Sequence, residues 1–144
     1  MFIGEYRHTL DSKNRISLPA KFRKELGSSV VVTRGLDHCL FIYGDKAWKN
    51  FSEKLSGLGV GQSDTRAFNR FILAGAIEGE IDTAGRVLIP DFLRDFASLK
   101  NSLVLAGVGN RVEIWDEKSW DAYKRSVDDK ADTLAEKLGD IGMI

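Results

Sequence analysis

A motif that occurs twice constrains the fold of this chain more than any other feature of its sequence. The first copy spans residues 11–19 and reads Asp-x-x-x-Arg, then an apolar residue, a variable residue, an apolar residue and a proline. The second copy, residues 82–90, keeps this order at a displacement of 71 positions. An internal repeat indicates duplicated structural units, so it takes precedence over local patterns in assigning the fold.

The similarity between the two copies continues on both sides of the motif. About 45 residues recur in the same order, and each copy predicts strand, turn, strand, short helix, strand, strand and helix. We place the units at residues 5–47 and 76–119, joined by a glycine-containing connector at 56–63 and a further helix. Units this small have marginal cores of their own, so we expect them to share one core.

Composition excludes several classes of protein. Apolar residues make up 43% and charged residues 29%, as in ordinary soluble domains, and no run approaches the roughly 20 apolar residues of a membrane span. The first residues lack the basic region and apolar run of a secretory signal. Cys39 is the only cysteine, which rules out an internal disulfide and favours a small core residue in a cytoplasmic protein without membrane partners.

Several local signals predict where elements begin and end. Asn14 and Gly85 occupy equivalent turn positions and suit left-handed backbone angles, while Pro19 suits the start of a short helix. Asp45 is expected to cap the next helix, and Ser63 or Asp64 to cap the connector helix.

The helices are expected to leave apolar surface for contacts between subunits. On the connector helix this surface is Phe68, Phe71 and Ile72. The last helix is predicted to be one long helix with a narrow apolar stripe, formed by Trp120, Tyr123, Val127, Ala131, Leu134 and Leu138.

Charge is distributed unevenly along a chain whose net charge is zero. Residues 1–26 carry six basic and three acidic side chains, whereas residues 116–144 carry five basic and eight acidic ones. This asymmetry favours a polyanion as the partner of the N-terminal region.

The two Asp-x-x-x-Arg motifs, the two prolines and the tryptophans Trp48 and Trp120, which open equivalent helices, resemble the MraZ family over essentially the whole chain. The resemblance implies an α+β fold in which two tandem SpoVT–AbrB-like, swapped-hairpin units form one pseudo-twofold interleaved β-barrel with peripheral helices. It also implies a sequence-specific, nucleoid-associated DNA-binding transcriptional regulator rather than an enzyme. Its expected partners are double-stranded DNA and further copies of itself in a ring-shaped homo-oligomer, without a cofactor. The resemblance further implies repeated short promoter boxes ahead of the bacterial division and cell-wall gene cluster that includes the protein's own gene.

Arginine suits the expected contact with DNA. Its guanidinium can donate two N–H groups to O6 and N7 of guanine or clamp a phosphate, and an aspartate four residues earlier can hold it in place. Lys13, Asn14 and Arg7 surround the first motif as candidate phosphate contacts. The second copy is less basic, since Ala84 matches Lys13. The predicted DNA-binding residues are therefore Arg15, Arg86, Asp11, Asp82, Lys13, Asn14 and Arg7.

Two alternative functions compete with DNA binding. An aspartic-protease-like hydrolase would pair Asp11 with Asp82 around a shared proton, but an arginine four residues away lowers carboxyl pKa values and opposes such sharing. An antitoxin-like protein-binding module would fit the acidic C-terminal helix. A metal site is not expected, because His8 and His38 lack further ligands at metal-binding spacing.

Overall fold

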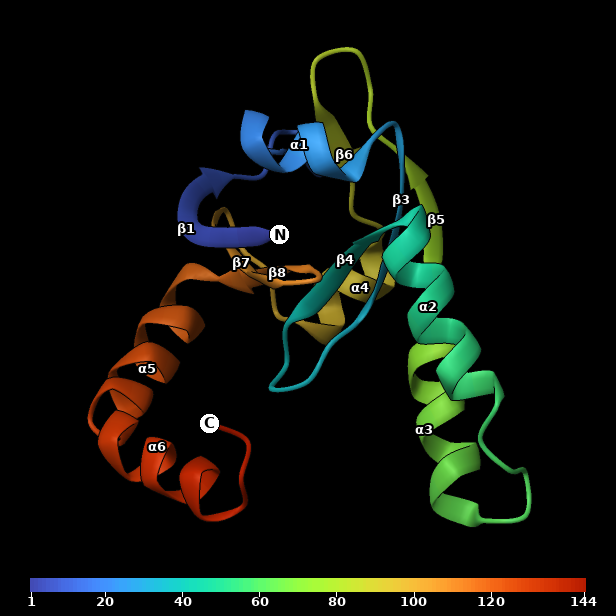
Figure 1. Ribbon diagram of the computed structural model, residues 1–144. Helices are drawn as coiled ribbons and strands as arrows, with labels where there is room; N and C mark the ends of the chain where they lie inside the picture. Colours follow the sequence, from blue (N-terminus) through green and yellow to red (C-terminus); the bar gives the residue numbers. More distant parts are fainter.

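A central six-stranded sheet organises the chain. The computed structural model describes all residues from Met1 to Ile144. Every strand pair is antiparallel, and the strand order is β1-β7-β8-β4-β3-β5. Figure 1 shows the helices arranged around this sheet. The strands are β1 (Phe2–Thr9), β3 (Ser29–Arg34), β4 (Leu40–Gly44), β5 (Ile77–Glu80), β7 (Ser102–Gly109) and β8 (Val112–Asp116).

A separate two-stranded ribbon joins β2 (Arg15–Ser17) to β6 (Arg86–Leu88). The combination of an antiparallel sheet with segregated helices confirms the predicted α+β class. The strand pairing does not close into a barrel, because β1 and β5 remain the two edges of the sheet. The helices are α1 (Ala20–Leu26), α2 (Asp45–Ser56), α3 (Ser63–Leu73), α4 (Asp91–Phe96), α5 (Glu117–Asp128) and α6 (Ala131–Asp140).

The two halves of the chain exchange their strands. The first strand of the N-terminal half, β1, pairs with β7 of the other half, and β5 pairs in return with β3. Replacing each strand by its counterpart in the other half (β1 and β5, β3 and β7, β4 and β8) gives the same order read from the opposite edge of the sheet. The halves therefore share one sheet, as the repeat predicts, while the unit boundaries at 5–47 and 76–119 stay a prediction.

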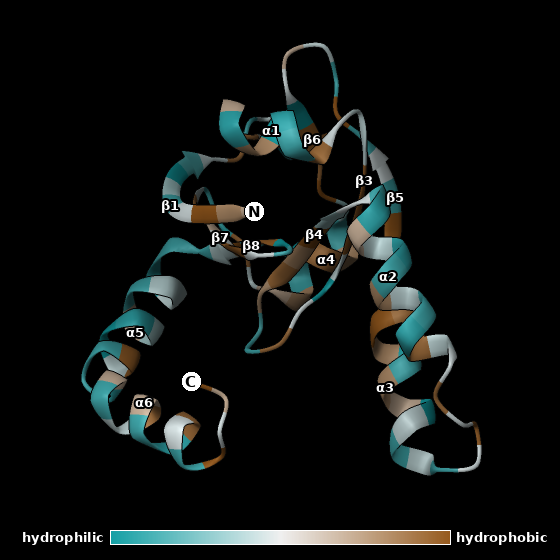
Figure 2. Ribbon diagram, in the orientation of Figure 1, coloured by the Kyte–Doolittle hydropathy of each residue, from teal (hydrophilic) through white to brown (hydrophobic).

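Alternation along the strands creates a core on each face of the sheet. Leu40 and Ile42 belong to the larger core, which the ribbon, α1 and α4 complete. Phe41 and Tyr43 point to the other face and pack with Trp115 in a smaller cluster bordered by α2 and α5. In Figure 2 the central strand β4 is largely apolar, whereas α2 and α5 are mainly polar.

The smaller cluster contains the residues that the sequence assigns to packing. Cys39 is fully buried in it, as predicted, and burial raises the pKa of its thiol. Burial likewise raises the pKa of Tyr43 to about 12. Trp48 and Trp120 border this cluster as partly buried residues, so they act as packing anchors for α2 and α5.

Two helical arms extend from the sheet. In Figure 1, α2 with α3 and α5 with α6 point away from the end of the molecule that carries the loop between β5 and β6. None of these helices combines the length and apolar character needed to cross a membrane.

The prediction of one long C-terminal helix is wrong. α5 ends at Asp128, and α6 begins only at Ala131, after Lys130 adopts the non-helical angles φ −114° and ψ 3°. Asp128 and Asp129 place two negative charges at the C-terminus of α5, where the helix dipole disfavours them. The predicted stripe is therefore divided between two helices, and Leu134 of α6 remains 41% exposed.

Two further predictions about the arms need correction. Asp45 is the first residue of α2 rather than its cap, and its carboxylate accepts hydrogen bonds from the Ser29 hydroxyl at 2.9 and 3.0 Å. Gln62, not Ser63 or Asp64, precedes α3, and its side chain makes no capping bond.

The apolar face predicted to be free on α3 is largely covered within the chain. Ile72 is fully buried, because the side chains of the sheet pack against this end of α3 and Thr33 donates to the Ile72 carbonyl. Phe71 packs against Phe96 of α4, with ring centroids 5.6 Å apart. Of the three, Phe68 is exposed, Phe71 is half-buried and Ile72 is buried.

The close approach of β1 and β7 gives a test of the exchanged sheet. Gly4 and Gly107 face each other across these strands, and a Cβ on Gly107 would lie 2.5 Å from the Ile3 nitrogen. We expect Gly107→Ala to lower the free energy of unfolding by about 1–3 kcal/mol, because the backbone of β1 must shift to accept the methyl group.

Urea denaturation monitored by circular dichroism measures this change. Gly61→Ala serves as the matched control, since no atom lies within 4 Å of the added Cβ, and its effect should stay within about 0.5 kcal/mol. Equal stability of the two variants would contradict the strand exchange.

Candidate nucleic-acid interface

The two motif copies fold into turns of the same construction. In the turn between β1 and β2, Asp11 Oδ1 accepts the backbone N–H groups of Lys13 at 2.8 Å and Arg15 at 2.9 Å. In the turn between β5 and β6, Asp82 Oδ1 accepts those of Ala84 at 3.0 Å and Arg86 at 2.9 Å. Each aspartate thus fixes the backbone of its turn.

The left-handed residue predicted for each turn is present. Asn14 has φ 61° and Gly85 has φ 80°. Glycine adopts this conformation without strain, and asparagine tolerates it better than most side chains. This agreement confirms the sequence-based interpretation of both turns.

Each aspartate also anchors the arginine that follows it. Arg15 Nε lies 2.8 Å from Asp11 Oδ2, and Arg86 Nε lies 2.9 Å from Asp82 Oδ2. The terminal nitrogens Nη1 and Nη2 of both arginines make no hydrogen bond within the chain, so each can present a planar pair of donors to a ligand.

The ribbon brings the two turns together. Ile16 pairs with Val87 at its centre, so Arg15 and Arg86 lie on the same face, opposite these two fully buried side chains. Leu18 N–H donates to the Gly85 carbonyl at 2.9 Å. The Ile89 N–H donates to the carbonyl of Asn14 at 3.0 Å, so each turn is held by the end of the other unit's ribbon strand.

Longer-range ion pairs connect the motifs across the ribbon. Arg15 Nη1 lies 4.0 Å from Asp82 Oδ2, and Arg86 Nη1 lies 3.8 Å from Asp11 Oδ2. Two arginines and two aspartates therefore form one cluster. The arginine side chains keep 26% and 33% of their surface exposed, which leaves them accessible to a partner.

The environment of the aspartates favours their ionised form. The backbone N–H of Arg15 is the main cause that lowers the pKa of Asp11, followed by the Arg15 side chain and the Lys13 N–H. The backbone N–H of Arg86 lowers the pKa of Asp82 in the same way. Two carboxylates held ionised by donors are unsuited to sharing a proton, which argues against the aspartic-protease hypothesis.

Six of the seven predicted site residues lie at the two turns, and Arg7 does not. Lys13 is exposed on the first turn beside Asn14. Arg7 instead forms ion pairs with Glu117 at 3.2 Å and Asp121 at 2.9 Å on α5. The Asp121 carboxylate raises the pKa of Arg7, and the Arg7 guanidinium lowers that of Asp121. Arg7 thus tethers α5 to β1.

Arg23 is a neighbour of the site that the sequence did not single out. This α1 residue lies against Gly85 of the other unit's turn, where a Cβ would collide with its guanidinium. The sequence shows a basic residue shortly after Pro19, but it contains no signal that α1 packs on the second turn.

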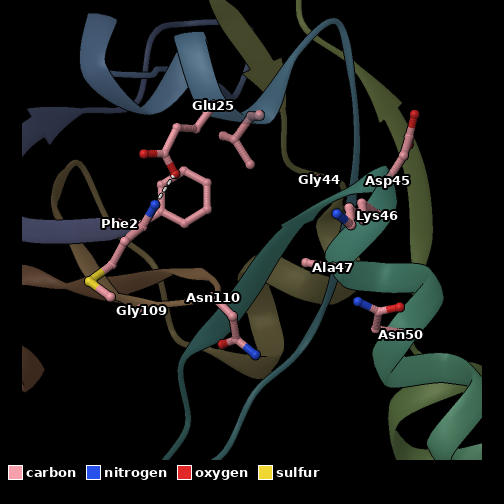
Figure 3. A pocket seen from close by; sticks show the side chains of 11 residues that line it. Phe2, Glu25, Gly44, Asp45, Lys46, Ala47, Asn50, Gly109 and Asn110 are labelled. Atoms are coloured by element: carbon pink, nitrogen blue, oxygen red, sulfur yellow. Dashed lines mark hydrogen bonds and ion pairs between the residues drawn. The ribbon is translucent and has the colours of Figure 1, made fainter.

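Other places in the molecule offer less chemistry. A hollow of about 390 Å³ lies between α1, the start of α2 and the turn joining β7 to β8 (Figure 3). Of its two carboxylates, Glu25 is paired with the Met1 ammonium at 2.7 Å and Asp45 accepts from the Ser29 hydroxyl, and the lining contains no Ser, Thr, Cys or His. No group of three His, Cys, Asp or Glu side chains is arranged to hold a metal ion, and His8 and His38 belong to none.

Comparison with known proteins places the repeat in a family. Residues 1–71 and 72–139 each match the family described as "MraZ protein, putative antitoxin-like". A protein of Natranaerobius thermophilus named transcriptional regulator MraZ is 49% identical over 140 residues, covering 97% of this chain and 98% of the relative. Relatives of the same name are 49% identical in Caldanaerobacter subterraneus, covering 96% of both chains, and 46% identical in Oenococcus oeni, covering 99% and 100%.

The charge on the turn aspartates can be tested through the pH dependence of stability. Because the pKa values of Asp11 and Asp82 are lowered in the folded state, their stabilising contribution is present above the unfolded pKa of about 3.9. It is lost as pH falls through the lower folded value. We expect Asp11→Asn and Asp82→Asn to be less stable than the wild type at pH 7 and to approach it towards pH 2.

Urea midpoints measured at intervals between pH 2 and pH 7 give the difference between each variant and the wild type. The difference isolates these two residues from the other carboxylates of the chain. A difference in urea midpoint that keeps its size down to pH 2 would show that the charge of these aspartates does not stabilise the turns.

Proposed function

This chain belongs to the MraZ family, and we propose that it is a sequence-specific DNA-binding transcription regulator whose paired turns contact the DNA. One observation carries the proposal: two arginines lie on the same exposed face of the ribbon, each anchored through Nε by its own aspartate. The names of the relatives support the same class of function.

The anchored arginines match the chemistry of guanine. Its O6 and N7 accept two donors in the major groove, and the free Nη1 and Nη2 groups of Arg15 and Arg86 supply such a pair. Because the Nε bond to Asp11 or Asp82 holds each guanidinium in place, less conformational freedom is lost on binding. Lys13 and Asn14 extend the first turn towards the phosphates.

A ring-shaped homo-oligomer supplies the affinity that one subunit lacks. The net charge is zero and each subunit offers few basic contacts, so one subunit should bind weakly at physiological salt. Joining several sites in one rigid assembly can raise affinity by roughly 10²–10⁴. The helical arms extend away from the β5–β6 turn, which leaves them free for contacts between subunits.

The DNA target and the symmetry of the two units complete the proposed mechanism. The target is a set of short repeated boxes ahead of the division and cell-wall gene cluster, including the protein's own gene, on the bacterial nucleoid in the cytoplasm. The equivalent units at residues 5–47 and 76–119 superpose by a pseudo-twofold rotation and form an interleaved, barrel-like core. Their similar turns then place two arginines over neighbouring bases.

A second candidate is an antitoxin-like protein-binding module. The exposed apolar residues of α6 and the C-terminal tail favour it, since Leu138 is 38% exposed and Ile141 is 68% exposed. Such a module would keep its protein partner after Arg15→Ala, whereas DNA binding would be lost.

Substitution of the arginines tests the DNA contact. Each bidentate contact to guanine is worth about 1–3 kcal/mol, and the loss recurs in every subunit of an assembly. We therefore expect Arg15→Ala to abolish the gel shift with DNA from upstream of the protein's own gene. Arg86→Ala should cost the same or less, because the second turn has Ala84 where the first has Lys13.

Arg7→Gln is the matched control, because Arg7 is engaged by Glu117 and Asp121 away from the turns. It should retain the shift. Loss of binding in Arg7→Gln together with an unaffected Arg15→Ala would move the interface from the ribbon to β1 and α5.

The spacing of boxes tests the oligomeric mechanism. Boxes about 10 bp apart face the same side of the duplex, so several subunits of one ring can contact them together. We expect three boxes to bind far more tightly than one, and an insertion of about 5 bp between boxes to weaken binding strongly. Titrations of these duplexes by fluorescence anisotropy measure both effects, with light scattering to record the assembly state.

The ring mechanism would be rejected if one box and three boxes bound with equal affinity, or if the half-turn insertion had no effect. Each subunit would then bind DNA independently. A monomer at micromolar concentration would also exclude the ring.

A further inference from the structure

Arg23 is a cation whose partners are missing from the chain. It forms no ion pair and no side-chain hydrogen bond, and its Nε is buried without an acceptor. Buried polar groups nearly always have a partner in a folded protein, so the unsatisfied N–H of Arg23 calls for an acceptor from outside the chain.

The fold places this arginine at the turn of the other unit. The Leu18 N–H bonds to the Gly85 carbonyl at 2.9 Å, and α1 begins two residues later. The backbone N–H of Arg23 bonds to the Pro19 carbonyl at 3.0 Å, which fixes it in the first turn of this helix. Its guanidinium therefore lies over Gly85, where any side chain would displace it.

The equivalent arginine of the second unit is used differently. Arg94 donates to the Ile89 carbonyl and forms an ion pair with Asp91, so its charge is neutralised within α4. The turn opposite it carries Asn14, which has a side chain where the second turn has Gly85. The two halves thus differ at this point despite their common construction.

The unpaired Arg23 compensates for a second difference between the two turns, which concerns their own cations. The first turn has Lys13 as an exposed cation of its own, whereas Ala84 holds the matching position in the second turn. Arg86 of the second turn is paired with Asp82, whereas Arg23, reaching across from the other unit, brings a positive charge that has no ion pair.

We propose that Arg23 and the β5–β6 turn form a phosphate-binding site for the DNA backbone. Arg23 of the first unit supplies to the second turn the cation that Lys13 supplies to the first. This inference rests on the proposed function and adds a residue to it. A guanidinium binds phosphate oxygens through two parallel N–H donors, and Gly85, which has no side chain, leaves room for the Arg23 guanidinium over the turn.

The salt dependence of binding tests this site. The duplex is chosen by selection from a random pool with the wild-type chain, and an unrelated duplex of equal length accompanies it. The slope of log affinity against log salt reports the number of phosphates neutralised, at about 0.9 for each. We expect Arg23→Ala to reduce this slope by about 0.9 for every subunit that contacts DNA, equally for both duplexes.

Three further variants separate the effect of the charge from an effect on the fold. Arg23→Lys should largely restore the slope, because lysine also binds phosphate as a point charge. Gly85→Asn keeps a residue that tolerates the left-handed turn, as Asn14 does, but displaces Arg23, so it should lower the slope as Arg23→Ala does. Lys137→Ala on α6 removes an equal charge from an arm that points away from the β5–β6 turn and should leave the slope unchanged.

The outcomes distinguish this inference from the proposed function. An unchanged slope in a folded Arg23→Ala would overturn the phosphate site while leaving the function intact if Arg15→Ala still loses the selected duplex. Loss of preference for the selected duplex in Arg23→Ala would assign Arg23 to the bases and likewise overturn it. Failure of the selection to yield a duplex that the wild type binds would reject the proposed function together with the inference.

Discussion

The pairing of β2 with β6 is the interaction on which the candidate interface depends. Ile16 and Val87 meet at its centre and are fully buried, so the pair fixes which side chains of the ribbon face solvent. The Leu18 bond to Gly85 and the Ile89 bond to Asn14 then lock each turn onto the opposite unit. Neither turn can move independently, and the four charged residues of the motifs keep a fixed relation to one another.

This arrangement separates the candidate DNA contact, in the ribbon, from a second task, the positioning of the helical arms. The ribbon carries the two arginines, and the helical arms extend away from the end of the molecule that holds the β5–β6 turn (Figure 1). Arg7 belongs to the second task, because its bonds to Glu117 and Asp121 attach α5 to the sheet. Charge alone therefore did not distinguish residues of the interface from residues that hold the arms.

The sequence predicted the parts of the fold that depend on local chemistry or on the repeat. Asn14 and Gly85 revealed the turns because left-handed backbone angles suit few residues, and the spacing of Asp and Arg revealed the anchored guanidiniums. The uninterrupted apolar run from Leu40 to Tyr43 is typical of a strand buried on both faces, as β4 is. These signals are contained within a few neighbouring positions, so they can be recognised without knowledge of the tertiary structure.

The remaining features arise from contacts between distant segments. Arg23 meets Gly85, and Arg7 meets Asp121 on α5, only because the halves exchange their strands. The break between α5 and α6 contains neither glycine nor proline, so the apolar spacing continued through it and predicted a single helix. Asp45 likewise matched a capping pattern, but the Ser29 hydroxyl of a neighbouring strand binds its carboxylate.

The exchange of strands also has a consequence for how the protein is made. Phe2 of β1 pairs with Gly109 of β7, so β1 leaves the ribosome before its partner and stays unpaired until β7 has been synthesised. Contacts between residues far apart in sequence slow folding, and an unpaired strand is prone to associate with other chains. During translation β1 is therefore a free edge that β7 of its own chain must reach before β7 of a neighbouring nascent chain does.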